Sequence, residues 1–104
     1  MDGGDLDWTD GRTATVWRRE GEVYTVLGDG LERSLGPGAD PVLSVYQNTI
    51  DLAWTSPEGI MLRRGNHEPV RVDAGRFSVL IAQRDRTLLA WEHNGKVLVS
   101  PLVR

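Results

Sequence analysis

IDLAW, residues 50–54, has two counterparts in this 104-residue chain: TATVW at residues 13–17 and TLLAW at residues 87–91. Each segment ends in tryptophan, and these tryptophans are spaced 37 residues apart. The alternation of apolar and polar residues within the segments is typical of β-strands. A fixed period of this length, written in strand-like pieces, indicates a chain built from tandem copies of one supersecondary unit.

The similarity extends to both sides of the repeated tryptophans, Trp17, Trp54 and Trp91. A leucine precedes each by eleven residues, at Leu6, Leu43 and Leu80. After each tryptophan a polar turn leads to a glycine, at Gly21, Gly59 and Gly95, and the middle turn is one residue longer. Pro-x-Gly and Asn-Gly sequences in these turns favour hairpins. We therefore assign structural roles in the repeat to the three tryptophans and the three glycines.

In this alignment each copy contains short segments rich in β-branched residues and bounded by Gly, Pro, Asn or Asp, which predict strands. The predicted strands are residues 6–8, 13–18, 22–27 and 31–35 in the first copy, 42–47, 50–55, 60–64 and 70–73 in the second, and 78–83, 87–92 and 96–99 in the third. A fourth strand of the third copy is missing or is supplied by the last few residues. No stretch keeps a helical period for three turns, so we expect an all-β protein without helices.

Both faces of these sheets are expected to be apolar. Ile50, Leu52 and Trp54 share one face of their strand, and in the third copy Leu88 and Ala90 make the opposite face apolar too. Face-to-face stacking of sheets, as in a β-propeller, covers both sides. We therefore predict a single repeat domain, residues 1–104, of about three four-stranded antiparallel blades at about 5–37, 38–75 and 76–104, the last incomplete. The alternative is an antiparallel β-sandwich, which has no reason to repeat a tryptophan at a fixed spacing.

Three blades cannot close a ring, because natural propellers have about four to eight. Either the chain is part of a longer propeller or copies assemble. Two chains of three blades would give a six-bladed ring, and unpartnered end blades would expose apolar surface that promotes association. We expect self-association through the end blades or completion by the remaining blades of a longer protein.

The run DPVLSVYQNTIDLAWTSPEGIMLRRGNHEPVRVDAGRF at residues 40–77, followed by SVLIAQRDRTLLAWEHNGKVLVSPL at 78–102, resembles the blades of sialidase-like, or bacterial neuraminidase repeat-like, propellers. In those blades a motif of the form "dPvvav…g.vvvaWt…Gi.lr…pvrld" recurs from blade to blade. The first copy is the most degenerate. The resemblance implies the propeller fold and is poorly specific for activity.

The resemblance does not carry catalytic residues over. The Asp-box S-x-D-x-G-x-T-W is absent from the sequence. Sialidases also need an arginine triad, a tyrosine nucleophile with its glutamate, and an aspartate acid/base. That set cannot be placed on Arg18, Arg19, Arg63, Arg64, Arg76, Tyr24 or Tyr46. We assign no catalytic residue, and whether the chain is an enzyme is left open, with a non-catalytic role favoured.

Composition excludes several classes of function. The chain has no cysteine, which rules out disulfides, thiolate catalysis and zinc–thiolate sites. The net charge of the whole chain is −3, and the first ten residues alone carry −4, so the rest of the chain is close to neutral. The sequence therefore lacks the basic surface that nucleic-acid binding requires. No apolar run is long enough for a membrane span and no signal peptide opens the chain, although a longer exported protein would carry its signal upstream. The compartment is left open.

We predict no metal site and no cofactor. The acidic run from Asp5 to Gly11 fails the EF-hand template, because the third acid is one place late and Val16 stands where the template requires glutamate. His67 and His93 lie in separate turns without a second ligand at a suitable spacing. Trp8 stands where the other copies have Val45 and Ala82, which marks an end-blade cap or an assembly face.

In propellers the loops after the second and fourth strands of each blade share a rim that usually binds ligands. This rim would gather Arg18, Arg19, Glu20, Ser56, Glu58, Glu92, His93 and Asn94, with the crossovers near Asp40 and Arg76. We interpret the tryptophans as packing residues between blades rather than as sugar-stacking platforms.

The leading hypothesis is a non-catalytic propeller module that serves as a binding or scaffold domain. The alternatives are the propeller part of a sialidase-like glycan hydrolase and a carbohydrate-binding lectin.

Overall fold

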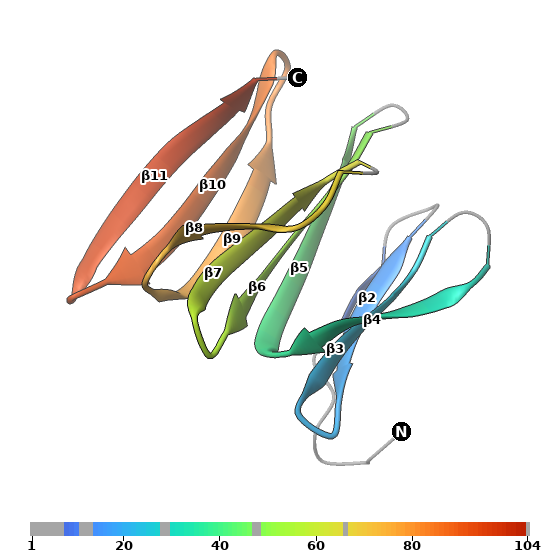
Figure 1. Cartoon of the computed structure of the whole chain (residues 1–104). Helices are drawn as coiled ribbons and strands as arrows, with labels where there is room; N and C mark the ends of the chain where they lie inside the picture. Colours follow the sequence, from blue (N-terminus) through green and yellow to red (C-terminus); the bar gives the residue numbers. More distant parts are fainter. Residues whose placement is uncertain (1–7, 11–13, 28–29, 47–48, 66, 104) are drawn as a thin grey trace.

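Three antiparallel sheets follow one another along the chain (Figure 1). The computed structural model describes residues 8–10, 14–27, 30–46, 49–65 and 67–103. Its strands are β1 (Trp8–Asp10), β2 (Thr15–Arg19), β3 (Glu22–Val26), β4 (Glu32–Pro37), β5 (Ala39–Tyr46), β6 (Thr49–Ser56), β7 (Gly59–Arg64), β8 (Val70–Asp73), β9 (Arg76–Ala82), β10 (Arg86–His93) and β11 (Lys96–Val103). The first sheet has the order β1-β2-β3-β4, the second β5-β6-β7-β8 and the third β9-β10-β11.

The all-β prediction is confirmed for the described residues, which contain strands and turns but no helix. Each pair of neighbouring strands is antiparallel, and each sheet is a meander of consecutive hairpins. None of the three sheets closes on itself. Within the described ranges, no helix is long and apolar enough to cross a membrane.

The backbone repeats with the same period as the sequence. Asp40 and Phe77, 37 residues apart, both adopt left-handed conformations, with φ of 52° and 57°. The last strand of each of the first two sheets carries an irregularity in its pairing with the strand before it, at Leu35 and at Val72, which are also 37 residues apart. Such bulges bend a strand and increase its twist. The copies therefore share local backbone geometry as well as side-chain pattern.

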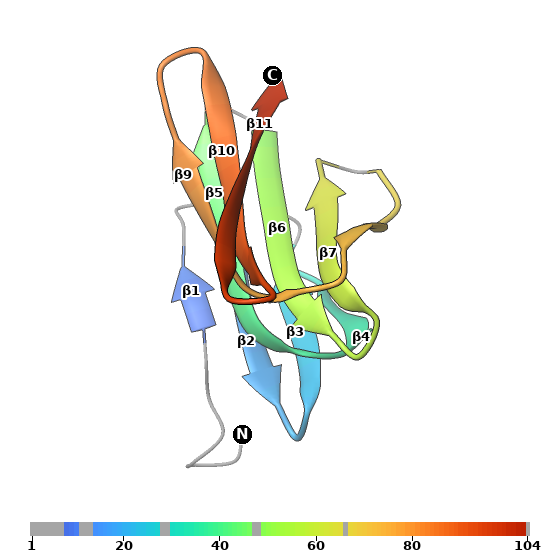
Figure 2. The ribbon, with the colours of Figure 1, turned by 90° about the vertical axis from the view of Figure 1, so that its left-hand side faces the viewer.

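The second sheet lies between the other two (Figures 1 and 2). On one face Leu52 and Trp54 form a core with Val16 and Val23 of the first sheet. A second core on the opposite face is built from Ala53, Ile60 and Leu62 of the second sheet with Leu89 and Trp91 of the third. The expected burial of both faces is thus confirmed for the second sheet, because alternate residues of β6 enter different cores.

The first strand of the first copy differs from its prediction. Val16 and Ala53 are equivalent in the repeat, yet Thr9 opposes Val16 whereas Val42 opposes Ala53, so β1 is displaced by four positions. Trp8 accordingly stands opposite Trp17 rather than in the position of Val45. A three-residue edge strand makes few ladder hydrogen bonds, and its register is weakly specified.

The third copy lacks a separate fourth strand in the part of the chain that the structure describes. The residues after Val99 continue β11, which pairs with β10 from Lys96 to Val103. They do not turn back to form a fourth strand, so the described third sheet has three strands. Hydrogen bonding along the whole length of β10 favours this continuation over a new turn.

Candidate functional site

The residues predicted to form a rim lie on one edge of the stacked sheets. The β2–β3, β6–β7 and β10–β11 turns point the same way, and the β4–β5 and β8–β9 crossovers lie on that edge too (lower edge of Figure 1). Two contacts join the crossovers to the hairpins: the Gly38 amide donates to the Gly21 carbonyl at 3.0 Å, and the Phe77 amide donates to Thr55 Oγ1 at 3.2 Å.

Local sequence explains the shape of these turns. Glu20–Gly21 and Asn94–Gly95 have positive φ at both positions, which is the pattern of a two-residue type I′ hairpin. In the longer middle turn the Ser56 hydroxyl accepts a hydrogen bond from the Glu58 amide at 3.1 Å and donates one to the Gly59 carbonyl at 3.0 Å. The extra residue is therefore accommodated by a serine-stabilised turn.

The predicted residues separate into three groups on this edge. Arg19 lies with its guanidinium 4.3 Å from the ring centre of Tyr24 and 3.5 Å from Glu32. These partners raise the pKa of Arg19, the side-chain hydrogen bond with Tyr24 most of all. Arg18 belongs to the opposite face of β2, as its pairing with Val23 shows, and Glu20 is exposed at the turn.

The other two groups line different pockets. Ser56 and Glu58 line a pocket of about 390 Å³ with Trp54. Glu92, His93 and Asn94 line one of about 450 Å³ near the β8–β9 crossover. The two pockets have no lining residue in common, so the described rim holds separate candidate sites rather than one.

The most closely connected polar group includes Asp73, which sequence reasoning missed. Asp73 Oδ2 accepts a hydrogen bond from Trp91 Nε1 at 2.9 Å and lies 2.9 Å from His93 Nδ1. These contacts join the end of β8 to β10, and therefore join the second sheet to the third. The hydrogen bond from Trp91, and next the contact with His93, lower the pKa of Asp73. With Nδ1 held by the carboxylate, the ring of His93 has a fixed orientation beside its pocket.

Asp73 could have been suggested by comparing the copies. It stands 18 residues before Trp91, and the equivalent position before Trp54 is Gly36. The sequence shows that a carboxylate in one copy replaces a glycine in the other. It does not show that this carboxylate contacts a tryptophan of the next sheet, which depends on how the sheets pack.

Two of the repeated tryptophans are packed between sheets. Trp54 is 1% exposed and Trp91 is 8% exposed, each facing the sheet before its own. Trp17 occupies the equivalent face of the first sheet, where its ring stacks on Tyr24 at 6.0 Å between centres. Trp17 Nε1 is buried without a hydrogen-bond partner among the described residues.

The structure offers no support for a metal centre in the part of the chain that it describes, where no three His, Asp or Glu residues are grouped to hold an ion. The acidic run from Asp5 to Gly11 lies outside the described residues, apart from the backbone of β1. His67 and His93 lie on different connections, with His67 exposed after β7.

No family model matches this chain, and searches of curated proteins and of solved structures found no match either.

Proposed function

We propose that this chain is a three-blade β-propeller segment that serves as a non-catalytic binding or scaffold module, and that a second copy completes its ring. The observation that carries the proposal is the pair of uncovered faces at the two ends of the stack. The resemblance of residues 40–102 to sialidase-like blades supports the same fold on separate grounds.

One uncovered face belongs to the third sheet. Val79, Ala90 and Val99 lie opposite one another across β9, β10 and β11. Ala90 is equivalent to Ala53, whose face of the second sheet is covered by the sheet that follows. In the third sheet this face exposes Phe77, Val79, Ile81, Val97 and Val99. An apolar sheet face of this kind normally meets another protein surface.

The other end face belongs to the first sheet, where Trp17 and Tyr24 are half-buried. Trp54 and Trp91 each face the preceding sheet, and Trp17 is the equivalent residue with no sheet before it among those described. Its neighbours Tyr24 and Arg19 lie on the same face. Within the stack, the tryptophan face of one sheet packs on the opposite face of the sheet before it. The chain has one face of each kind at its two ends.

A second copy supplies both missing partners. The third sheet of one copy would pack on the first sheet of the other, and a two-fold axis would create this contact twice, giving a ring of six blades. The remaining blades of a longer protein would cover the two end faces in the same way. Measuring the mass of the chain in solution distinguishes this alternative from a dimer.

A non-catalytic role fits the rim, where acidic, basic and amide side chains are spread over separate pockets. Unlike turns on a rigid repeated frame are typical of recognition surfaces.

The test is the mass of the chain in solution. Light scattering on the purified 11.6 kDa chain should give twice that mass at micromolar concentration. A soluble, folded monomer contradicts completion by a second copy and favours completion by other blades. Alanine substitutions at Glu58 and His93 that leave every candidate ligand bound as before would remove the rim as the recognition surface.

A further inference from the structure

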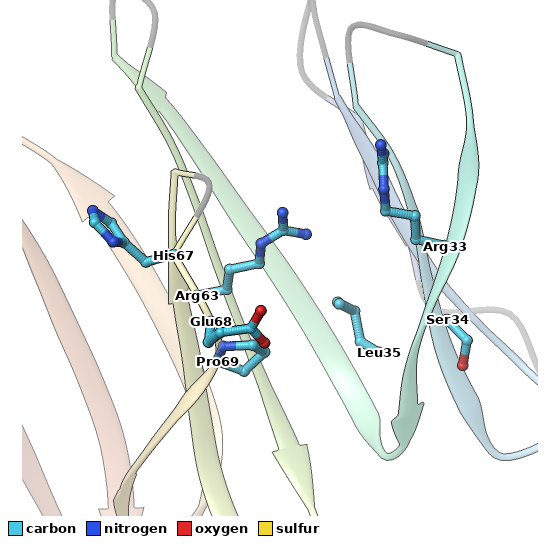
Figure 3. A pocket seen from close by; sticks show the side chains of 7 residues that line it. All are labelled: Arg33, Ser34, Leu35, Arg63, His67, Glu68 and Pro69. Atoms are coloured by element: carbon cyan, nitrogen blue, oxygen red, sulfur yellow. The ribbon is translucent and has the colours of Figure 1, made fainter.

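A groove runs between the first and second sheets on the side of β4, β7 and β8. It consists of the pocket of about 390 Å³ beside Trp54 and a second pocket of about 280 Å³, which share Leu35 and Pro69 as lining residues. Met61 and Pro37 make the first part apolar, while polar side chains line the second. Figure 3 shows the second part, with Leu35 directed from β4 into the space facing β7 and β8.

Trp54 brings an unused hydrogen-bond donor to this groove. Its side chain is almost fully buried, it lines the larger pocket, and its Nε1 has no hydrogen-bond partner among the described residues. Trp54 Nε1 is not one of the fully buried polar atoms that lack a partner, so this donor is open to the groove that Trp54 lines. An acceptor placed in the groove can therefore reach it.

The equivalent tryptophan shows which acceptor fits. Trp54 and Trp91 sit in the same way: a Cβ added to Gly38 would lie 2.9 Å from Cδ1 of Trp54, and one added to Gly75 would lie 2.9 Å from Cδ1 of Trp91. Between the second and third sheets, the Asp73 carboxylate accepts the indole hydrogen bond. The position equivalent to Asp73 is Gly36, which has no side chain. The groove is therefore open where the other junction holds a carboxylate.

A cation lies further along the same groove. Arg63 extends from β7 into the gap between the sheets (Figure 3). It makes no ion pair or hydrogen bond with the other described residues. The carboxylates of Glu58 and Glu68 also line the groove, but both residues are exposed and free to turn toward water.

We propose that this groove binds a small organic carboxylate. The carboxylate accepts a hydrogen bond from Trp54 Nε1, as Asp73 does from Trp91, and Arg63 balances its charge. The apolar body of the ligand lies against Leu35, Met61 and Pro69. This site includes the β6–β7 turn of the rim, whose Ser56 and Glu58 line its larger part, and it does not depend on how the ring is completed.

The test is a titration followed by NMR of the tryptophan indole groups, with acetate, phenylacetate and the neutral phenylacetamide as probes. The Trp54 signal is identified by its proximity to Gly38, and the Trp91 signal by its proximity to Gly75. Phenylacetate should shift the Trp54 indole proton downfield in a saturable manner and leave that of Trp91 in place. Acetate should give the same shift with weaker binding, and phenylacetamide should bind at least about tenfold more weakly than phenylacetate.

Matched charge variants complete the test. Arg63→Gln should weaken phenylacetate binding about tenfold, whereas Arg86→Gln, an exposed arginine on the third sheet, should leave it unchanged. Unchanged dispersion of the remaining signals verifies that each variant is folded. The proposal is overturned if millimolar phenylacetate produces no saturable shift of the Trp54 indole, if phenylacetamide binds as tightly, or if Arg63→Gln and Arg86→Gln bind equally.

Discussion

Gly38 and Gly75 have the same surroundings. A Cβ on Gly38 would lie 2.7 Å from the carbonyl oxygen of Thr55 and 2.9 Å from Cδ1 of Trp54. A Cβ on Gly75 would lie 2.6 Å from the carbonyl oxygen of Glu92 and 2.9 Å from Cδ1 of Trp91. The two crossovers between sheets therefore pass over a tryptophan at a point where only hydrogen fits.

Alanine at either glycine should destabilise the protein. The added methyl group meets backbone atoms that cannot move without shifting a strand, so we expect Gly38→Ala and Gly75→Ala each to cost about 1–3 kcal/mol. Urea denaturation followed by circular dichroism measures the effect. Because the two sites are equivalent, a neutral result at either one would contradict this account of the crossovers.

Acid should weaken the junction between the second and third sheets. The pKa of Asp73 is lowered from its ordinary value of 3.8, chiefly by the hydrogen bond from Trp91. A carboxyl whose pKa is lower in the folded state stabilises the fold above its unfolded pKa, and this contribution disappears as the pH falls through the folded pKa.

The measurement compares the wild type with Asp73→Asn, which keeps an acceptor for Trp91 but does not titrate. Urea denaturation at a series of pH values should show a difference in unfolding free energy that shrinks as the pH falls below about 4. A difference that stays the same down to strongly acidic pH would contradict the assigned role of Asp73.

Charge on the open face of the third sheet should prevent self-association. Val99 and Val70 are almost equally exposed, at 57% and 56%, but Val99 lies on the apolar face of β11 and Val70 lies on β8. Val99→Lys should halve the solution mass, because a buried ammonium without a partner is costly. Val70→Lys should leave the mass unchanged, and equal behaviour of the two variants would place the contact elsewhere.

The ion pair of Asp51 and Arg64 should compensate the charge of a buried carboxylate while adding little to the net free energy of unfolding. Asp51 Oδ1 lies 3.1 Å from Arg64 Nε, and the carboxylate side chain is 4% exposed. Arg64→Met should cost about 2–3 kcal/mol because it leaves that carboxylate without its cation. Adding Asp51→Leu, which places the residue type of the equivalent Leu88, should recover most of the loss.

Denaturation of both single variants and the double variant tests this coupling in a thermodynamic cycle. Additive losses would show that Asp51 does not depend on Arg64 for compensation.

Several features could be predicted from sequence because they depend on local pattern. The alternation around Trp54 predicted a strand buried on both faces, and Leu52 and Ala53 indeed enter different cores. The Asn94–Gly95 turn has the positive φ values that its residues favour. The position of β1 could not be predicted in this way, since a short edge strand has too few contacts to select one register.

The candidate sites were harder to predict because they lie between copies. Glu92, His93 and Asn94 were expected on a rim and lie on one edge, but the partner of His93 is Asp73, a residue of the preceding sheet. The donor at Trp54 becomes meaningful only beside Leu35 and Pro37, which line the same pocket and are distant from Trp54 in sequence.

By itself, the sequence determined the period of 37 residues, the strands and the turns, because hydrophobic alternation and the preferences of Gly, Pro and Asn act over a few neighbouring residues. The tertiary structure alone decided which tryptophan gains a carboxylate partner, which one faces an open groove, and which sheet faces remain uncovered. These outcomes depend on the stacking of sheets, which brings together side chains that no local pattern relates.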